Sequence, residues 1–287
     1  MKILFICFSF LLFINACDIK HPPEEVDPNA VFDVMDTYNS DSCYPYDTYK
    51  SLLDKSLYKD KYGNVMILDD NFSKIYYNSS SFNKDLIHLD DENNLVFFID
   101  KEKNSPKVSS KLLQKDTWFT SDEDGNYFIS KLRFLKPENT NSYTVMQAHG
   151  VYKEDSNSSI YYNYPLLQIV WRRYYGSSDK IYDHLWAIVT KSAPGDDEPK
   201  IYEWIDLGPR EDNEISLEVH ISHNIMEVKL NYTTLTIQNV SYWERVPTYF
   251  DAGVSIDNYI DKGKACVVFK QLRFEDDPQN VENITHF

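Results

Sequence analysis

The amino-acid sequence predicts an all-β protein, a β-sandwich of two curved antiparallel sheets with jelly-roll connections. From about residue 60 onward, short segments of alternating apolar and polar residues follow one another, and polar turns separate them. Only one segment, residues 46–58, has a helical pattern. Many strands at this spacing are typical of sandwiches and barrels, and the chain has no internal repeat that would indicate another architecture.

Turn residues bound each expected strand. The connectors at 136–142, 153–159, 192–199 and 208–214 are rich in Pro, Gly, Asn, Asp and Ser, as loops are. Residues 215–240 contain three strands joined by short turns, which predicts an antiparallel meander. The expected strands cover residues 94–100, 126–134, 143–152, 165–175, 184–191, 215–222, 225–232, 234–243, 249–256 and 265–274.

The N-terminal segment has the pattern of an export signal. Residues 1–16 contain one Lys, a long apolar run and small residues, which is typical of a signal peptide. The ending "INAC" resembles a bacterial lipobox, in which Cys17 becomes the lipidated first residue; ordinary cleavage nearby is the alternative. Residues 17–45 then read as a lipid-anchored linker and irregular lead-in, and residues 46–287 as one β domain. We expect a cell-surface or outer-membrane lipoprotein, otherwise a secreted protein, that meets the membrane only through its lipid anchor.

Cysteine and charge set further bounds. After cleavage, Cys43 and Cys266 remain, and an exported protein can pair them or keep both thiols buried, since sequence does not give their separation. The net charge of −16 opposes binding to nucleic acid. Neither a phosphate-binding glycine loop nor a zinc-ligand spacing occurs, and "SDEDG" at 121–125 lacks the spaced ligands of a calcium loop. We therefore expect a monomer without a metal or cofactor.

The segment "YTVMQAHG", residues 143–150, is unusual for a strand. If it is extended, Tyr143, Val145, Gln147 and His149 share one face, and Thr144, Met146 and Ala148 share the other, which is the expected core face. An amide and an imidazole then lie side by side on the face away from the core. A lone histidine is usually a structural residue, so the adjacent amide is the feature of this strand that needs an explanation.

Three segments together resemble the signature strands of the alginate-lyase-like polysaccharide lyases of family seven. The family motifs read R-[ST]-E-L-R, Q-[IV]-H and Y-F-K-A-G-[VI]-Y-N-Q. The sequence offers "ISKLRF" at 129–134, "QAH" at 147–149 and "YFDAGVSID" at 249–257, in the same order, and the likeness covers roughly residues 90–275. The resemblance implies a concanavalin-like jelly roll that cleaves uronate polysaccharides by β-elimination.

The resemblance also implies roles for individual residues, and several motif positions differ. In this alignment Arg133 matches the second motif Arg, whereas Ile129 replaces the first and Lys131 replaces the motif Glu. Asp251 replaces the motif Lys, so that Lys131 and Asp251 would form the motif ion pair with its charges exchanged. Ser255 replaces the motif Tyr, and Tyr259, Tyr174 or Tyr175 would have to supply the missing phenol. The implied catalytic residues are His149, Gln147, Arg133 and Tyr259, and the implied substrate-binding residues are Lys131, Tyr249, Arg173, Tyr175 and Ser255.

In the family chemistry, cationic and amide donors neutralise the uronate carboxylate, a base removes the C5 proton, and an acid protonates the leaving oxygen. The sequence therefore predicts a lyase acting on an acidic glycan such as alginate. The main alternative is a surface lipoprotein of the same fold that binds glycan without cleaving it. A structural surface protein would leave Gln147, His149 and Arg133 unexplained, and glycoside hydrolysis would need a pair of facing carboxylates that the sequence does not supply.

Overall fold

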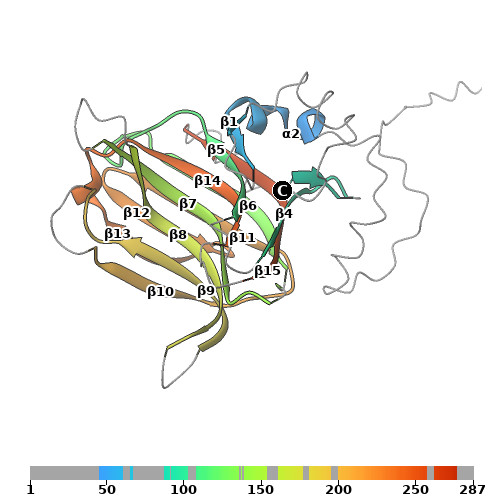
Figure 1. The fold of residues 1–287 in the computed structure, drawn as a ribbon. Helices are drawn as coiled ribbons and strands as arrows, with labels where there is room; N and C mark the ends of the chain where they lie inside the picture. Colours follow the sequence, from blue (N-terminus) through green and yellow to red (C-terminus); the bar gives the residue numbers. More distant parts are fainter. Residues whose placement is uncertain are drawn as a thin grey trace, which may run out of the picture.

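The protein is a sandwich of two antiparallel β-sheets, seen in a computed structural model (Figure 1). The structure describes residues 45–60, 65–66, 87–90, 92–102, 108–135, 137, 139–153, 161–176, 181–194, 200–256 and 262–276. The predicted signal peptide, Cys17, Cys43 and Tyr259 lie outside the described residues. Among the residues described, no helix has both the length and the apolar composition needed to cross a membrane.

One sheet has eight strands in the order β10-β9-β8-β7-β14-β5-β1-β2, and we call it sheet A. Non-consecutive neighbours such as β7-β14-β5 are the crossovers of a jelly roll. Its strands are β1 (Ser56–Lys59), β2 (Val65–Met66), β5 (Val108–Gln114), β7 (Ser142–Lys153), β8 (Tyr161–Tyr175), β9 (Ile181–Thr190), β10 (Tyr202–Pro209) and β14 (Thr248–Ile256).

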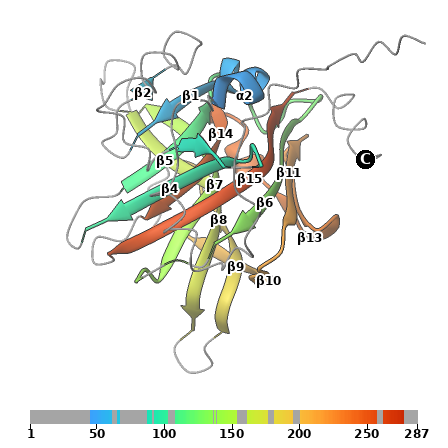
Figure 2. The same cartoon turned by 90° about the vertical axis from the view of Figure 1, so that its right-hand side faces the viewer.

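The other sheet, sheet B, has seven strands in the order β13-β12-β11-β6-β15-β4-β3, and it forms the second layer (Figure 2). The predicted meander is β11, β12 and β13, which are neighbours in this order at one edge. The strands are β3 (Ile87–Leu89), β4 (Leu95–Lys101), β6 (Asn126–Phe134), β11 (Ile215–Ser222), β12 (Ile225–Leu230), β13 (Thr233–Asn239) and β15 (Gly263–Glu275).

The core lies between the two sheets, and aromatic rings join the layers. Phe250 of β14 stands between them, with its ring centroid 6.1 Å from that of Phe128 on β6 and 6.4 Å from that of Phe274 on β15. Ala252, Val254 and Ile256 follow on the same face of β14, all fully buried in this core. The period-two alternation of β14 therefore turns its other residues to the face of sheet A that points away from the core. We call this the outer face of sheet A.

The predicted all-β sandwich is confirmed, and the strand boundaries differ in a few places. The expected helix 46–58 is α2 (Pro45–Asp54), followed by β1, and α2 lies at one end of the sandwich next to β1 (Figure 1). The strand expected at 234–243 ends at Asn239, because a short 3-10 helix, η2 (Ser241–Trp243), follows it. Strands β1, β2, β3, β5 and β10 were not predicted.

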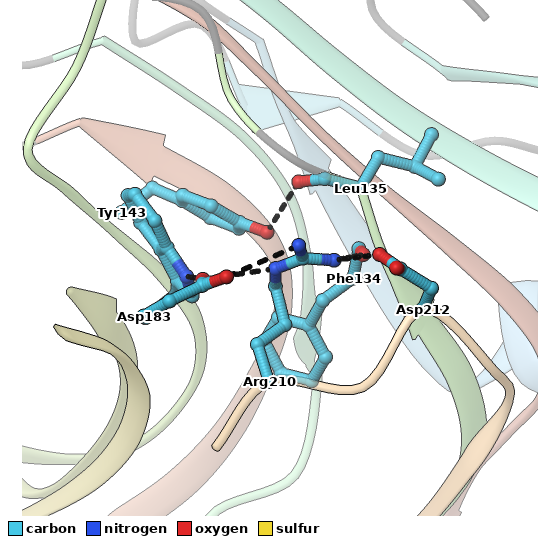
Figure 3. A network of polar contacts seen from close by, with 7 residues as sticks. Phe134, Leu135, Tyr143, Asp183, Arg210 and Asp212 are labelled. Atoms are coloured by element: carbon cyan, nitrogen blue, oxygen red, sulfur yellow. Dashed lines mark hydrogen bonds and ion pairs between the residues drawn. The ribbon is translucent and has the colours of Figure 1, made fainter. Parts of the chain in front are cut away.

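An ionic network fastens sheet A to sheet B at one end (Figure 3). The Arg210 guanidinium donates to Asp183 at 3.0 Å and 3.2 Å, to Asp212 at 2.7 Å and to the Phe134 carbonyl of β6 at 3.3 Å. The Tyr143 hydroxyl of β7 donates to the Leu135 carbonyl at 3.0 Å. Bonds to Phe134 and Leu135 reach across the sandwich, so this network fixes how the two sheets meet.

The side chain of Arg210 is only 6% exposed, whereas those of its partners Asp183 and Asp212 are 43% and 70% exposed. Burial lowers the pKa of Arg210, but hydrogen bonds to Asp183 and Asp212 outweigh it and raise the pKa. Trp171 donates to the same Asp183 carboxylate at 2.6 Å from the core side of β8. The network therefore supports the ends of β8, β9 and β10 as a unit.

Replacing Arg210 by Met is expected to lower the free energy of unfolding by about 2 kcal/mol, because Asp183 and the Phe134 carbonyl lose their charged donor. Urea denaturation measures this change. Lys50→Met is the matched control, since Lys50 bonds Asp54 at 3.0 Å in an exposed pair and its loss is expected to cost only about 0–0.5 kcal/mol. Equal losses in the two variants would show that the network does not fasten the sheets.

Candidate active site

Gln147 and His149 lie together on the outer face of sheet A. Their neighbours Met146 and Ala148 belong to the core between the sheets, and the two polar side chains point the other way. Both are nevertheless buried, with exposed fractions of 1% for Gln147 and 7% for His149. The His149 Nε2 atom is 2.9 Å from the Gln147 Oε1 atom. The predicted adjacency of amide and imidazole is therefore present in the structure.

The predicted face of β7 is wrong for its first half. The register of β7 against β8 shifts between Thr144 and Met146, where β7 has one extra residue, and this indicates a β-bulge at Val145. Tyr143 and Val145 consequently belong to the core, although they have the same sequence parity as Gln147 and His149. Thr144 lies opposite Ser255 and Val170, on the outer face. One inserted residue is enough to exchange the two faces.

Strand β14 brings two more side chains to the same place. Asp251 lies opposite Gln147, and Tyr249 lies opposite His149. The Asp251 Oδ2 atom is 3.0 Å from His149 Nε2, and the rings of Tyr249 and His149 are stacked with centroids 5.7 Å apart. Asp251 therefore fixes the imidazole from one side, while Tyr249 packs on its ring.

Strand β5 completes the cluster with Lys111. Its Nζ atom is 3.1 Å from the Asp251 carboxylate, and it also donates to Gln147 Oε1. Lys111 lies opposite Gly253, whose φ is +145°. A Cβ on Gly253 would overlap the Ser110 carbonyl oxygen and lie 2.8 Å from the Lys111 Cα, so glycine permits β5 to approach β14 here. We call Lys111, Gln147, His149 and Asp251 the polar cluster.

The charges of the polar cluster balance in a nearly dry environment. Side-chain exposure is 4% for Lys111 and 2% for Asp251. Burial alone would raise the pKa of the Asp251 carboxyl, but the Lys111 ammonium and His149 lower this pKa from 3.8 to about 2. Asp251 is therefore an anion at neutral pH, and it can only accept hydrogen bonds.

The hydrogen-bond partners assign the roles of Gln147 and His149. His149 Nε2 faces two acceptors, Gln147 Oε1 and the Asp251 carboxylate, so this nitrogen carries a hydrogen. In the neutral ring, Nδ1 then holds the basic lone pair. Gln147 Oε1 accepts hydrogen bonds from both Lys111 and His149, which fixes the position of the amide oxygen. The NH₂ group of Gln147 is then the group that can donate to a ligand.

The predicted grouping of Arg133 and Lys131 with His149 is wrong. Both belong to β6 in sheet B, whereas His149 belongs to sheet A. Leu132 and Phe134, the alternate residues of β6, occupy the core, so Arg133 and Lys131 face away from it on the opposite side of the sandwich. The charge of Arg133 influences Cys266 instead. Burial raises the pKa of the Cys266 thiol, and the Arg133 charge opposes this shift. The predicted Lys131–Asp251 ion pair cannot form across the core.

Strand β5, and not β6, lies next to β14 in sheet A. In register with R-[ST]-E-L-R, β5 reads Ser109, Ser110, Lys111, Leu112 and Leu113, and it lies next to β14. An ion pair with exchanged charges does exist, but Lys111 forms it. Ser109 and Leu113 stand where the motif has arginines. Ser255, opposite Ser109 and fully buried, stands where the motif has its second tyrosine.

The remaining predicted site residues have other surroundings. Arg173 is exposed on β8, where its backbone N–H donates to Asn141, and it is separate from the polar cluster. Tyr175 at the end of β8 belongs to a ring cluster with Trp186 and Trp204, described below. Within the described part of the chain, no group of three or more His, Cys, Asp or Glu residues is arranged to hold a metal ion.

Sequence reasoning missed Lys111, which the structure places at the centre of the cluster. The signal for it is the Ser-x-Leu part of "SSKLL", which keeps two of the five motif positions. The better match of "ISKLRF" to the letters L and R favoured the wrong strand. Pairing with β14 is the property that distinguishes the two segments, and it is not visible in either one alone.

The chain resembles known proteins over most of its length. A family model described as alginate lyase matches residues 71–276. A curated alginate lyase of Photobacterium sp. (strain ATCC 43367) is 26% identical over 152 residues, which cover 47% of this chain and 50% of that protein. The chain thus spans about half the length of the curated relative that it matches.

Solved structures share the fold at lower identity. Alginate lyase AlyC3 in complex with dimannuronate has a TM-score of 0.65 at 18% identity, covering 83% of this chain and 97% of that one. Alginate lyase A1-II', a member of polysaccharide lyase family 7, has a TM-score of 0.60 at 15% identity, covering 81% and 98%. Since the family model matches well over half of the 287 residues, the chain belongs to the alginate lyase family.

Proposed function

We propose that this protein is a polysaccharide lyase that cleaves a uronate-containing glycan such as alginate by β-elimination, with Gln147 and His149 at the reacting centre. Family membership supports the reaction class. The observation that carries the proposal is the polar cluster, in which a buried ion pair holds an amide and an imidazole 2.9 Å apart on the outer face of sheet A.

The proposed role of Gln147 is to bind the uronate carboxylate. Neutralising that carboxylate makes the neighbouring C5 proton acidic, and charge-assisted hydrogen bonds are suited to this. Lys111 donates to the amide oxygen, which polarises the amide and strengthens donation from its NH₂ group. Gln147 with Lys111 behind it would thus supply part of the positive potential that the arginines of the family motif supply.

His149 is the proposed base that removes the C5 proton. Asp251 accepts from its Nε2–H at 3.0 Å, which fixes the ring and stabilises the imidazolium that forms when Nδ1 takes the proton. The Tyr249 ring, stacked at 5.7 Å, restricts the imidazole further. Tyr259 is proposed as the acid that protonates the leaving oxygen, and this assignment rests only on the sequence.

A second candidate function is glycan binding without cleavage. Ser109, Leu113 and Ser255 replace two charged donors and a phenol of the family motifs, and Ser255 has no exposed surface. One lost general acid costs about 10²–10⁴-fold in rate, so the loss of several groups favours weak turnover or none. The two candidates differ in one measurable quantity, the release of unsaturated uronate.

Export and lipidation stay predictions from the sequence. We propose that Cys17 is the mature, lipidated N-terminus of an exported protein, which the "INAC" ending supports. Mass spectrometry of the mature chain should find a diacylglycerol-modified Cys17 and no preceding residues. An exported chain with unmodified Cys17 would contradict this.

The lyase proposal predicts slow release of unsaturated product that depends on His149. Purified protein is incubated with alginate and with glucuronan, and ultraviolet absorbance follows the product. His149→Ala is expected to lower the rate by about 10²-fold or more, because the C5 proton then has no base. Gln147→Ala should lower it as well, because the carboxylate loses its donor.

His223→Asn is the matched control. His223 is an exposed histidine between β11 and β12 in sheet B with φ +50°, a conformation that asparagine accepts, so this variant should keep the wild-type rate. Product release that survives His149→Ala would refute the assigned base. Binding of polyuronate with no product from the wild type would refute the lyase and favour the glycan-binding alternative.

A further inference from the structure

Three aromatic rings form a cluster on sheet A away from the polar cluster. Tyr175 of β8 lies 4.4 Å from Trp186 of β9 and 5.0 Å from Trp204 of β10, measured between ring centroids. The two tryptophans are 6.3 Å apart. Trp186 alternates with the core residues Leu185 and Ala187 of β9, so it faces the outer side of sheet A. Trp204 of β10 lies opposite Ile188, which is on this same face of β9. This ring cluster thus shares the face of Gln147 and His149.

An arginine lies against these rings. The Arg172 guanidinium carbon is 5.0 Å from the Trp204 ring centroid and 5.9 Å from that of Tyr175, within the range of cation–π attraction. Within the described part of the chain, no carboxylate lies within 4.0 Å of Arg172. One acid on this face, Asp206, lies opposite Trp186, and it is already bonded by His184 at 2.7 Å and by the Gly208 N–H at 2.8 Å.

Arg172, Tyr175 and Trp204 are the half-buried members of this group, whereas Trp186 is only 4% exposed. Among the described residues, the buried Trp186 Nε1 and Arg172 Nε atoms have no hydrogen-bond partner, which is costly for a donor. The Arg172 guanidinium and the rings of Tyr175 and Trp204 offer a positive charge and apolar ring faces to a ligand. A sugar that carries a carboxylate matches both.

Arg172 and the polar cluster are linked through strand β8. Gln168 of β8 lies opposite Gln147, and Arg172 follows four residues later on the same face. The separation along the strand is about 13 Å at the usual rise per residue. Such a distance suits two different sugar units of one chain, because a single sugar at Gln147 would not contact Arg172.

We propose that Arg172, Tyr175, Trp186 and Trp204 form a second, non-catalytic subsite that binds a uronate unit of the same polymer, remote from His149. This inference rests on the proposed function for its ligand class. Arg172 binds the carboxylate, and the half-buried rings of Trp204 and Tyr175 contact the apolar face of the sugar. The subsite raises affinity for long chains and has no contact with the reacting sugar.

The test is calorimetric titration of alginate oligomers, a disaccharide and a long oligomer, onto His149→Ala protein, which prevents turnover. In this background, Arg172→Gln and Trp204→Ala are each expected to weaken binding of the long oligomer about tenfold to a hundredfold, and to leave disaccharide binding at the polar cluster unchanged. Arg172→Lys should recover part of the loss, because the charge is kept. Tyr232→Ala is the matched control, because Tyr232 is 64% exposed in the turn between β12 and β13.

Each outcome separates this inference from the proposed function. Equal affinity of the His149→Ala protein and its Arg172→Gln and Trp204→Ala derivatives for the long oligomer, with unchanged melting temperatures, would overturn the subsite even if the wild type releases unsaturated product. Equal binding of a neutral oligosaccharide would overturn the carboxylate assignment. A loss confined to the long uronate oligomer would support the subsite even if the wild type proves to be a binding protein without lyase activity.

Discussion

A buried ion pair between Lys111 and Asp251 is the interaction on which the candidate active site depends. Removing two charges from water costs several kcal/mol each, and mutual attraction repays this only when further hydrogen bonds satisfy both groups. Gln147 and His149 supply those bonds, so every member of the polar cluster has its hydrogen-bonding groups satisfied in part by the other members. The ion pair therefore determines where the amide oxygen points and which imidazole nitrogen keeps its hydrogen. It also relies on Gly253, which lets β5 approach β14 closely enough for the pair to form.

The sandwich gives the outer face of sheet A two parts with different chemistry. The central strands β5, β14 and β7 hold the polar cluster, where proton transfer is proposed. The edge strands β8, β9 and β10 hold the rings and Arg172, where only binding is proposed. The Arg210 network lies under this second part and fastens it to sheet B. Since both parts are built on paired strands, their spacing is fixed by the sheet itself.

Regular alternation made most of the fold predictable from sequence, and its interruptions explain the failures. Strand β14 alternates throughout, whereas β5 has three polar residues in a row, Ser109 to Lys111, that tertiary contacts bury on both faces. The edge strand β10 shows no clean alternation of burial. Gln147 and His149 were predictable because residues two apart share a face. The bulge at Val145 and the placement of Arg133 in sheet B were not, because register shifts and strand order are set by partners far along the chain.

Exchanging the two charges of the buried pair tests its organising role most directly. Urea denaturation would give the free energies of unfolding of Lys111→Glu, Asp251→Lys and the double variant, which has the charge order of the family motifs. Each single change leaves two like charges side by side and is predicted to cost about 3–5 kcal/mol. The loss in the double variant should be smaller than the sum of the two single losses, with a coupling energy of about 2–3 kcal/mol. Single losses that simply add in the double variant would contradict the account.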